Sequence, residues 1–323
     1  MATSGTIGTT VINTAKMLEK ALRRAGLPPQ AVTPETVETA SDSLFMLLMS
    51  LTNRGLNLWC IDKQFIPLTV GQALYNLPVG TLSVLNLLQA TPSRADYVVS
   101  TNTATSTSDV ALVRYGIKFS TQPDVPCAFE HSQDGITWTV LNTITVADLH
   151  PTGMYNWFDC DPQINAMYFR VNGLVAGVVS DIYLSTNNRE IVVAQFNRDD
   201  YANQPNKNFQ SSSVTNFYFE KLVNPKITVW PVPNDDVRHL VLFRHRQVED
   251  VGSLTQTLEI PSRWIEAITW QLCVRLCFEL PGIDQARRGE VTQMATAMMA
   301  EVESGETDSA PLYYQPNVGV YTR

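Results

Sequence analysis

The chain has 323 residues, of which 44% are hydrophobic and 17% charged, and its formal net charge is −8. This length allows two domains of ordinary size, and the composition excludes a fibrous or disordered protein. The chain contains no run of 18 apolar residues, and Met1 to Thr10 lacks the pattern of a secretory signal, so we expect neither a membrane span nor a leader. Lys and Arg form no block or stripe, which argues against tight binding of DNA phosphates.

Two amphipathic helices are predicted near the N-terminus. The first runs from Thr14 to Ala25 and stops at Gly26, and the second begins after the N-cap Thr33 and ends before Gly55. In both segments apolar residues recur at steps of three and four, which places them on one face of each helix. The short link between the segments contains prolines and indicates an antiparallel pair.

The pattern then changes to that of strands. Residues 64–68 and 72–77 flank Val70-Gly71, which predicts a β-hairpin, and 84–88 is a further apolar run. Strands are also expected later in the chain, within 190–196, 227–230 and 240–243.

The segment 93–182 differs in composition from its surroundings. It contains four Lys or Arg against nine Asp or Glu, and it is rich in Ser, Thr and Asn. Short apolar runs alternate in it with turn residues such as Asp134-Gly135. Regular short strands separated by turns are typical of a β-sandwich, and a surface loop tolerates such an insertion. We therefore expect an all-β domain inserted here.

Two further helices are expected near the C-terminus, from Pro261 to Leu280 and from Asp284 to Glu303. The second of these is expected to turn five side chains inward, namely Val291, Met294, Ala295, Met298 and Val302. The expected fold class is α+β. Segments 1–92 and 183–303 form a helical bundle with a β-hairpin region, 93–182 is an inserted jelly roll or sandwich, and 304–323 is an extended tail.

Six stretches of this sequence, in order, resemble the head-to-tail adaptors of short-tailed bacteriophages, a family also called head-completion or packaged-DNA-stabilisation proteins. They lie within 1–92 and 183–303: Lys16–Gly26, Ala40–Trp59, Gly71–Pro78, Asp199–Lys207, Ile227–Pro233 and Pro261–Ile268. The simpler members of the family lack a counterpart of 93–182.

The resemblance implies a virion structural protein without a cofactor and without catalysis. It implies a ring, expected to be a dodecamer, that docks under the portal protein, extends the DNA channel and offers a platform to a tail nozzle or tube protein. The tail would reach the portal, with Leu312, Tyr313, Tyr314, Val318 and Tyr321 as docking residues. Assembly would take place in the host cytoplasm. The acidic balance would let DNA pass without sticking, and without recognition of its sequence.

The insert has a weaker resemblance of its own. Ser132–Trp138 and Ala166–Val171 are similar to pieces of discoidin-like jelly rolls, many of which bind sugars through loops. Because a domain of this size would block a DNA channel, the insert is expected to face outward, towards capsid, tail fibre or host glycans. Two alternatives remain open at this point: a glycan-binding or fibre-attachment module, in which Trp138, Tyr155, Trp157 and Phe158 would stack on sugars, and a wall hydrolase carried in the virion.

Other candidate sites have simpler interpretations. Arg244 and Arg246 form the densest basic spot and are expected to make salt bridges across a subunit interface rather than to contact DNA. Cys273 and Cys277 share a helical face and are expected to be core thiols, since a metal would need more soft ligands nearby. The carboxylates at the end of the last helix, including Glu301, are expected to be solvated.

Overall fold

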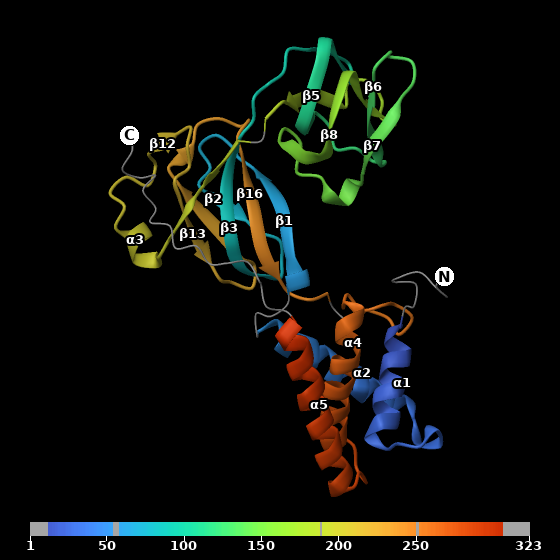
Figure 1. The fold of residues 1–323 in the computed structure, drawn as a ribbon. Coiled ribbons are helices and arrows are strands. Elements are labelled where there is room, and N and C mark those ends of the chain that lie inside the picture. Colours follow the sequence, from blue (N-terminus) through green and yellow to red (C-terminus); the bar gives the residue numbers. More distant parts are fainter. Residues whose placement is uncertain (1–11, 54–57, 188, 250–251, 306–323) are drawn as a thin grey trace. The chain divides into compact units, whose positions relative to one another are not determined.

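The structure is a computed structural model that describes residues 12–53, 58–187, 189–249 and 252–305. The chain divides into two compact units, one made of its two ends, up to Cys60 and from Gln247, and the other spanning Ile61–Arg246. The first unit is helical and the second consists mainly of β-sheets (Figure 1). The expected α+β class is confirmed. None of the helices within the described ranges is long and apolar enough to cross a membrane.

In its described residues the helical unit contains four long helices and two short 3₁₀ turns. They are α1 (Thr14–Ala25), η1 (Pro29–Ala31), α2 (Pro34–Thr52), η2 (Leu58–Cys60), α4 (Ser262–Glu279) and α5 (Gln285–Gly305). The Asn13 side chain caps α1, and Gly26 ends it in the left-handed conformation with φ of 101°. A capping box formed by Thr33 and Thr36 begins α2.

Helix α4 is the centre of this unit and packs against α1, α2 and α5. Its buried face includes Trp264, whose ring lies 4.9 Å from that of Trp59. On α5 the residue that turns inward with Val291 and Ala295 is Met299, while Met294 is exposed. The prediction for Met294 was therefore wrong, because a repeat of four residues keeps these three side chains on the face towards α4.

Two four-stranded sheets of the β unit share one core. The first has the order β1 (Ile61–Pro67), β16 (His239–Arg246), β3 (Thr81–Thr91), β10 (Arg189–Val192), and the second β11 (Ala194–Phe196), β13 (Asn216–Glu220), β14 (Lys226–Trp230), β2 (Leu74–Asn76). A single buried cluster combines side chains of both, for example Leu240 and Leu242 with Phe217 and Ile227. The two sheets therefore face each other. Helix α3 (Arg198–Ala202) and the pair β12 (Gln210–Ser211) and β15 (Val232–Pro233) complete this region.

The hairpin expected around Val70-Gly71 is absent from the described strands. β1 pairs with β16, whereas β2 pairs with β14 in the opposite sheet. The turn at Gly71 therefore carries the chain from one sheet to the other, because each strand finds its partner far away in the sequence.

The remaining strands form a third, antiparallel sheet of six strands. They are β4 (Val98–Ser100), β5 (Thr103–Phe119), β6 (Cys127–Ser132), β7 (Thr139–Ile144), β8 (Tyr155–Asn172) and β9 (Val179–Ser185), with η3 (Val146–Asp148) after β7. The long strands β5 and β8 pair along most of their length with two shifts of register. Such bulges bend a sheet, and here the strands curve around a core that includes Phe129, Phe169 and Ile182.

Candidate functional site

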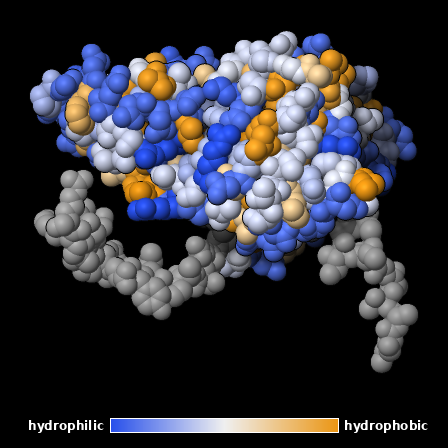
Figure 2. All heavy atoms as spheres, turned by 90° about the horizontal axis from the view of Figure 1, so that it is seen from above, coloured by the Kyte–Doolittle hydropathy of each residue, from blue (hydrophilic) through white to orange (hydrophobic). Residues whose placement is uncertain are grey.

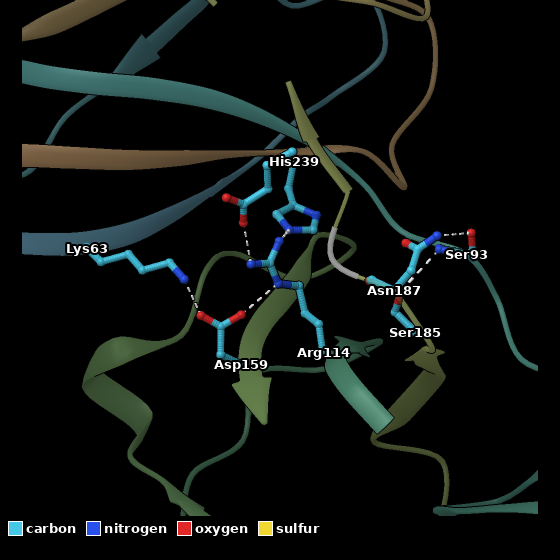
Figure 3. A network of polar contacts seen from close by, with 8 residues as sticks. Lys63, Ser93, Arg114, Asp159, Ser185, Asn187 and His239 are labelled. Atoms are coloured by element: carbon cyan, nitrogen blue, oxygen red, sulfur yellow. Dashed lines mark hydrogen bonds and ion pairs between the residues drawn. The ribbon is translucent and has the colours of Figure 1, made fainter. Parts of the chain in front are cut away.

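Arg114 on β5 is the most deeply buried charged residue that the structure describes, with 1% of its side chain exposed. Its Nε donates to Asp159 Oδ1 at 2.8 Å, and its Nη2 donates to Glu190 Oε1 at 2.7 Å. Its Nη1 lies 2.9 Å from His239 Nε2. Because a guanidinium only donates, that imidazole nitrogen accepts, and the neutral ring carries its proton on Nδ1. The side chain is satisfied on three sides (Figure 3).

The network around Arg114 joins two sheets. Arg114 and Asp159 belong to the six-stranded sheet, whereas Glu190 and His239 lie on β10 and β16 of the first four-stranded sheet. Lys63 on β1 also pairs with Asp159. Each ion pair of this network therefore either connects the 93–182 region to the first four-stranded sheet or orients a side chain that makes this connection.

A second set of hydrogen bonds holds the two chain crossings between these sheets. Ser93, which leads into the six-stranded sheet, donates its backbone N–H to Ser185 Oγ at 3.1 Å. Asn187, which leads out, donates from Nδ2 to Ser93 Oγ at 2.6 Å. Figure 3 shows these three residues beside the Arg114 network. The segment that enters the six-stranded sheet and the segment that leaves it are thus hydrogen-bonded directly to each other.

Aromatic rings fill the rest of the joint, the contact between the six-stranded sheet and the first four-stranded sheet. Trp157 stacks on the His239 imidazole with ring centroids 4.2 Å apart, and the guanidinium of Arg114 lies 4.8 Å from the Phe65 ring centre. Tyr155 and Tyr183 pack beside Trp157 in the same buried cluster. Stacked rings and a cation over a ring are favourable where water is excluded, so the joint is apolar around its charges.

The electrostatic environment keeps His239 neutral. Burial, together with the adjacent charge of Arg114, holds the pKa of His239 well below its usual range. A proton on this ring would remove the acceptor that Arg114 uses and would place two cations in contact. The site therefore positions its groups firmly but offers no free base.

A cleft of about 630 Å³ opens beside the joint. Its walls combine the rings of Phe65, Trp157 and Phe158 with polar side chains, among them Asn142 and His150. A volume of this size accommodates a small ligand. Rings and amides together are suited to a neutral, hydroxyl-rich molecule more than to a charged one.

Metal ligands are not assembled in the described part of the chain. No three His, Cys, Asp or Glu side chains there gather closely enough to hold a metal ion. None of the five cysteines forms a disulfide, and burial raises the pKa of Cys273 to about 12. Burial also raises the pKa of Cys127, Cys160 and Cys277, so these thiols stay protonated near neutral pH. The interpretation of Cys273 and Cys277 as core residues agrees with their burial.

The predicted basic spot already has a partner within the chain. Arg244 is buried and binds both carboxylate oxygens of Asp62, at 2.7 and 2.9 Å. Arg246 lies on the same face of β16 and its Nε is 3.6 Å from Asp62 Oδ2. Asp62 stands directly opposite Arg244 on β1. The bridge across a subunit interface stays a prediction, but inside this protomer the two arginines fasten β16 to β1.

The other residues singled out from the sequence lie apart from one another. Asp134 accepts hydrogen bonds from the backbone of Ile136 and Thr137 and closes a turn, as its position before Gly135 suggested. Trp138 is half-buried with Arg170 over its ring, away from Trp157. Glu301 and Glu303 lie in the last turns of α5. The five docking residues of the tail lie outside the described residues, and Ser304 and Gly305, expected to open the tail, still belong to α5.

No known protein family and no curated protein sequence matches the chain. Among solved structures, the C-terminal domain of a chitobiase from Bacteroides fragilis shows 17% identity over 28% of this chain and 62% of its own length, with a TM-score of 0.21. A rhamnosidase from Novosphingobium sp. PP1Y shows 12% identity over 90% of this chain and 36% of its own length, with a TM-score of 0.22. The chain spans less than two thirds of either structure, and superpositions at this level bear on neither fold nor function.

Replacing Arg114 with Met should destabilise the β unit by about 3 kcal/mol, because Glu190 loses its cation and Asp159 keeps only Lys63. The free energy of unfolding can be measured by chemical denaturation. The matched control is Arg23→Met, which breaks an exposed pair with Glu19 and should cost less than about 1 kcal/mol. Equal losses in both variants would show that the Arg114 network does not hold the joint.

His239 should make stability depend on pH. Its pKa is lower in the folded chain than in the unfolded one, so the stabilisation is complete above the unfolded value and is lost as the pH falls below it. We expect the free energy of unfolding to drop between about pH 7.5 and about pH 5.5, above the range where carboxylates titrate. His131, His150 and His245 contribute with the same sign. The His239→Gln variant should therefore show a shallower slope, and an unchanged slope would contradict the assignment.

Proposed function

We propose that this protein is a virion structural protein, a head-to-tail adaptor that forms a ring under the portal of a short-tailed bacteriophage. The observation that supports this most is the surface of the helical unit. Helices from both ends of the chain bury a common core, yet Phe45, Met46, Phe278 and Met294 remain exposed on α2, α4 and α5. Exposed large apolar side chains on a well-packed bundle are typical of surfaces that meet another protein.

The β unit suits a mechanical role as well. Its buried arginines form ion pairs within the chain. Arg114 pairs with Asp159 and Glu190, and Arg244 pairs with Asp62. Such networks fix the geometry of packed sheets rather than perform chemistry. On the face shown in Figure 2, apolar side chains lie in small patches separated by polar ones. We therefore assign no catalytic role and no cofactor to the chain.

The partners follow from this role. The portal protein would bind segment 306–323, whose apolar and tyrosine side chains suit an interface because they bury area and keep a polar tip. A tail nozzle or tube protein would dock on the opposite end of the ring. The 93–182 region would face capsid or tail fibre. DNA would pass through the neck of the virion along an acidic protein without being gripped, since like charges repel.

Mixing the purified chain with the portal protein encoded by the same genome should give particles with an added ring. Negative-stain class averages should show that ring on one end of the portal, with the rotational symmetry of the portal itself. Deleting 306–323 should abolish attachment but leave the melting temperature unchanged, because α5 and its core contacts remain. A chain that stays a single protomer beside assembled portals would rule out the adaptor function.

Glycan binding is a second candidate function, supported by the cleft between Phe65 and Trp157. Neutral oligosaccharides would stack on its rings and hydrogen-bond to Asn142 and His150. A glycan array probed with the whole chain should then show a class of neutral glycans that the Asn142→Leu variant no longer binds. The matched control is Asn165→Leu, which lies on β8 outside the cleft. Binding that survives Asn142→Leu, or no binding at all, would eliminate this candidate.

A further inference from the structure

Helix α2 presents a ridge to solvent that is acidic in its first half and apolar in its second. The ridge consists of Glu35, Glu38, Asp42, Phe45 and Met46, all exposed, which fall within one third of the helical circumference. Met46 is 59% exposed. Glu38 and Asp42 have no cation partner among the described residues. This pattern differs from an ordinary solvated helix face because large apolar residues continue the line of the acids.

Helix α5 presents a groove of the opposite character. The groove has a volume of about 730 Å³ and is lined by small neutral side chains from Gly289 to Ala300, with Phe278 of α4 and Arg288 at one end. Phe278 is 67% exposed. The guanidinium of Arg288 lies 5.6 Å from its ring centre, and Arg288 Nε has no hydrogen-bond partner within the described residues. The groove is therefore lined mostly by neutral side chains and has at one end the cation Arg288, which has no carboxylate partner within the described residues.

We infer that the α5 groove of one copy receives the α2 ridge of the neighbouring copy, an inference that rests on the proposed ring function. Charge complementarity supports this occupant: Glu38 and Asp42 would meet Arg288, and Met46 would lie over the small residues beyond it. Helices α2 and α5 both pack on α4, so the ridge and the groove are separate surfaces of one bundle. Contact between two different surfaces of identical chains is heterologous, and such contacts close into rings.

Charge also fixes the direction of the two helices. With Asp42 opposite Arg288, a parallel arrangement sets Met46, four residues further, opposite Thr292, and continues towards Ala297 and Ala300. An antiparallel arrangement over the same groove would bring the acids of α2 towards Glu301 at the other end of α5. Like charges in contact are unfavourable, so the parallel direction is the one that the surfaces select. Parallel pairing of α5 with α5 would oppose Arg288 to Arg288 and is excluded on the same ground.

A charge-swap experiment tests the contact. Arg288→Glu and Asp42→Arg should each weaken ring formation about tenfold, and the double variant should restore most of it, because the pair is rebuilt with reversed signs. Ring formation is scored by negative-stain imaging on portal particles. The control Lys20→Glu, an exposed change on α1 with the same charge difference as Arg288→Glu, should leave assembly unchanged.

Disulfide trapping tests the direction. Met46→Cys mixed with Thr292→Cys should form a cross-link between copies under mild oxidation, whereas Met46→Cys mixed with Ala300→Cys should not, since that position lies about 12 Å further along the helix. Rings that form equally well in Arg288→Glu and Asp42→Arg would overturn the inference and leave the adaptor function intact. A chain that forms no ring under any of these conditions would overturn both.

Discussion

The β unit depends on one buried cation. A guanidinium removed from water is tolerated only when each of its donors has an acceptor, and Arg114 finds two carboxylates and a neutral imidazole on three strands besides its own. Those strands belong to two sheets, so the requirement of one side chain fixes how the sheets meet. The aromatic cluster around Trp157 then excludes water and strengthens the same ion pairs.

This constraint explains how the 93–182 region is held against its neighbouring sheet. A domain joined by two crossing segments would ordinarily move about them, because interfaces between domains are small and polar. Here the crossings are hydrogen-bonded to each other through Ser93, Ser185 and Asn187. A few ångströms away Arg114 binds across the joint. The region is therefore held to the first four-stranded sheet by both hydrogen bonds and ion pairs.

Local signals in the sequence were sufficient to predict where the N-terminal helices begin and end. The cap at Thr33, the stop at Gly26 and the apolar repeat of α2 each act within a few residues, and all three appear in the structure as expected. The prediction of a hairpin around Gly71 was wrong because strands pair with partners far away in the sequence. β1 pairs with β16, which begins at His239. The Arg114 network was missed for the same reason. Its partners lie 45, 76 and 125 residues away, and nothing near Arg114 in the sequence marks it as buried.

On the proposed ring function, the two units would divide the physical tasks of a subunit between them. The buried ion pairs of the β unit join strands within one chain, because Arg114 and Arg244 both bind carboxylates of the same chain. The helical unit keeps its charges on the surface, where each pair between exposed groups contributes little and is screened by salt. A contact of this kind is weak for two free copies. It becomes effective once copies are held side by side on a portal, because each added copy then binds at a high local concentration and the last one closes two contacts at once. If the proposed contact holds, weak and complementary surfaces would favour assembly on the portal over assembly in free solution.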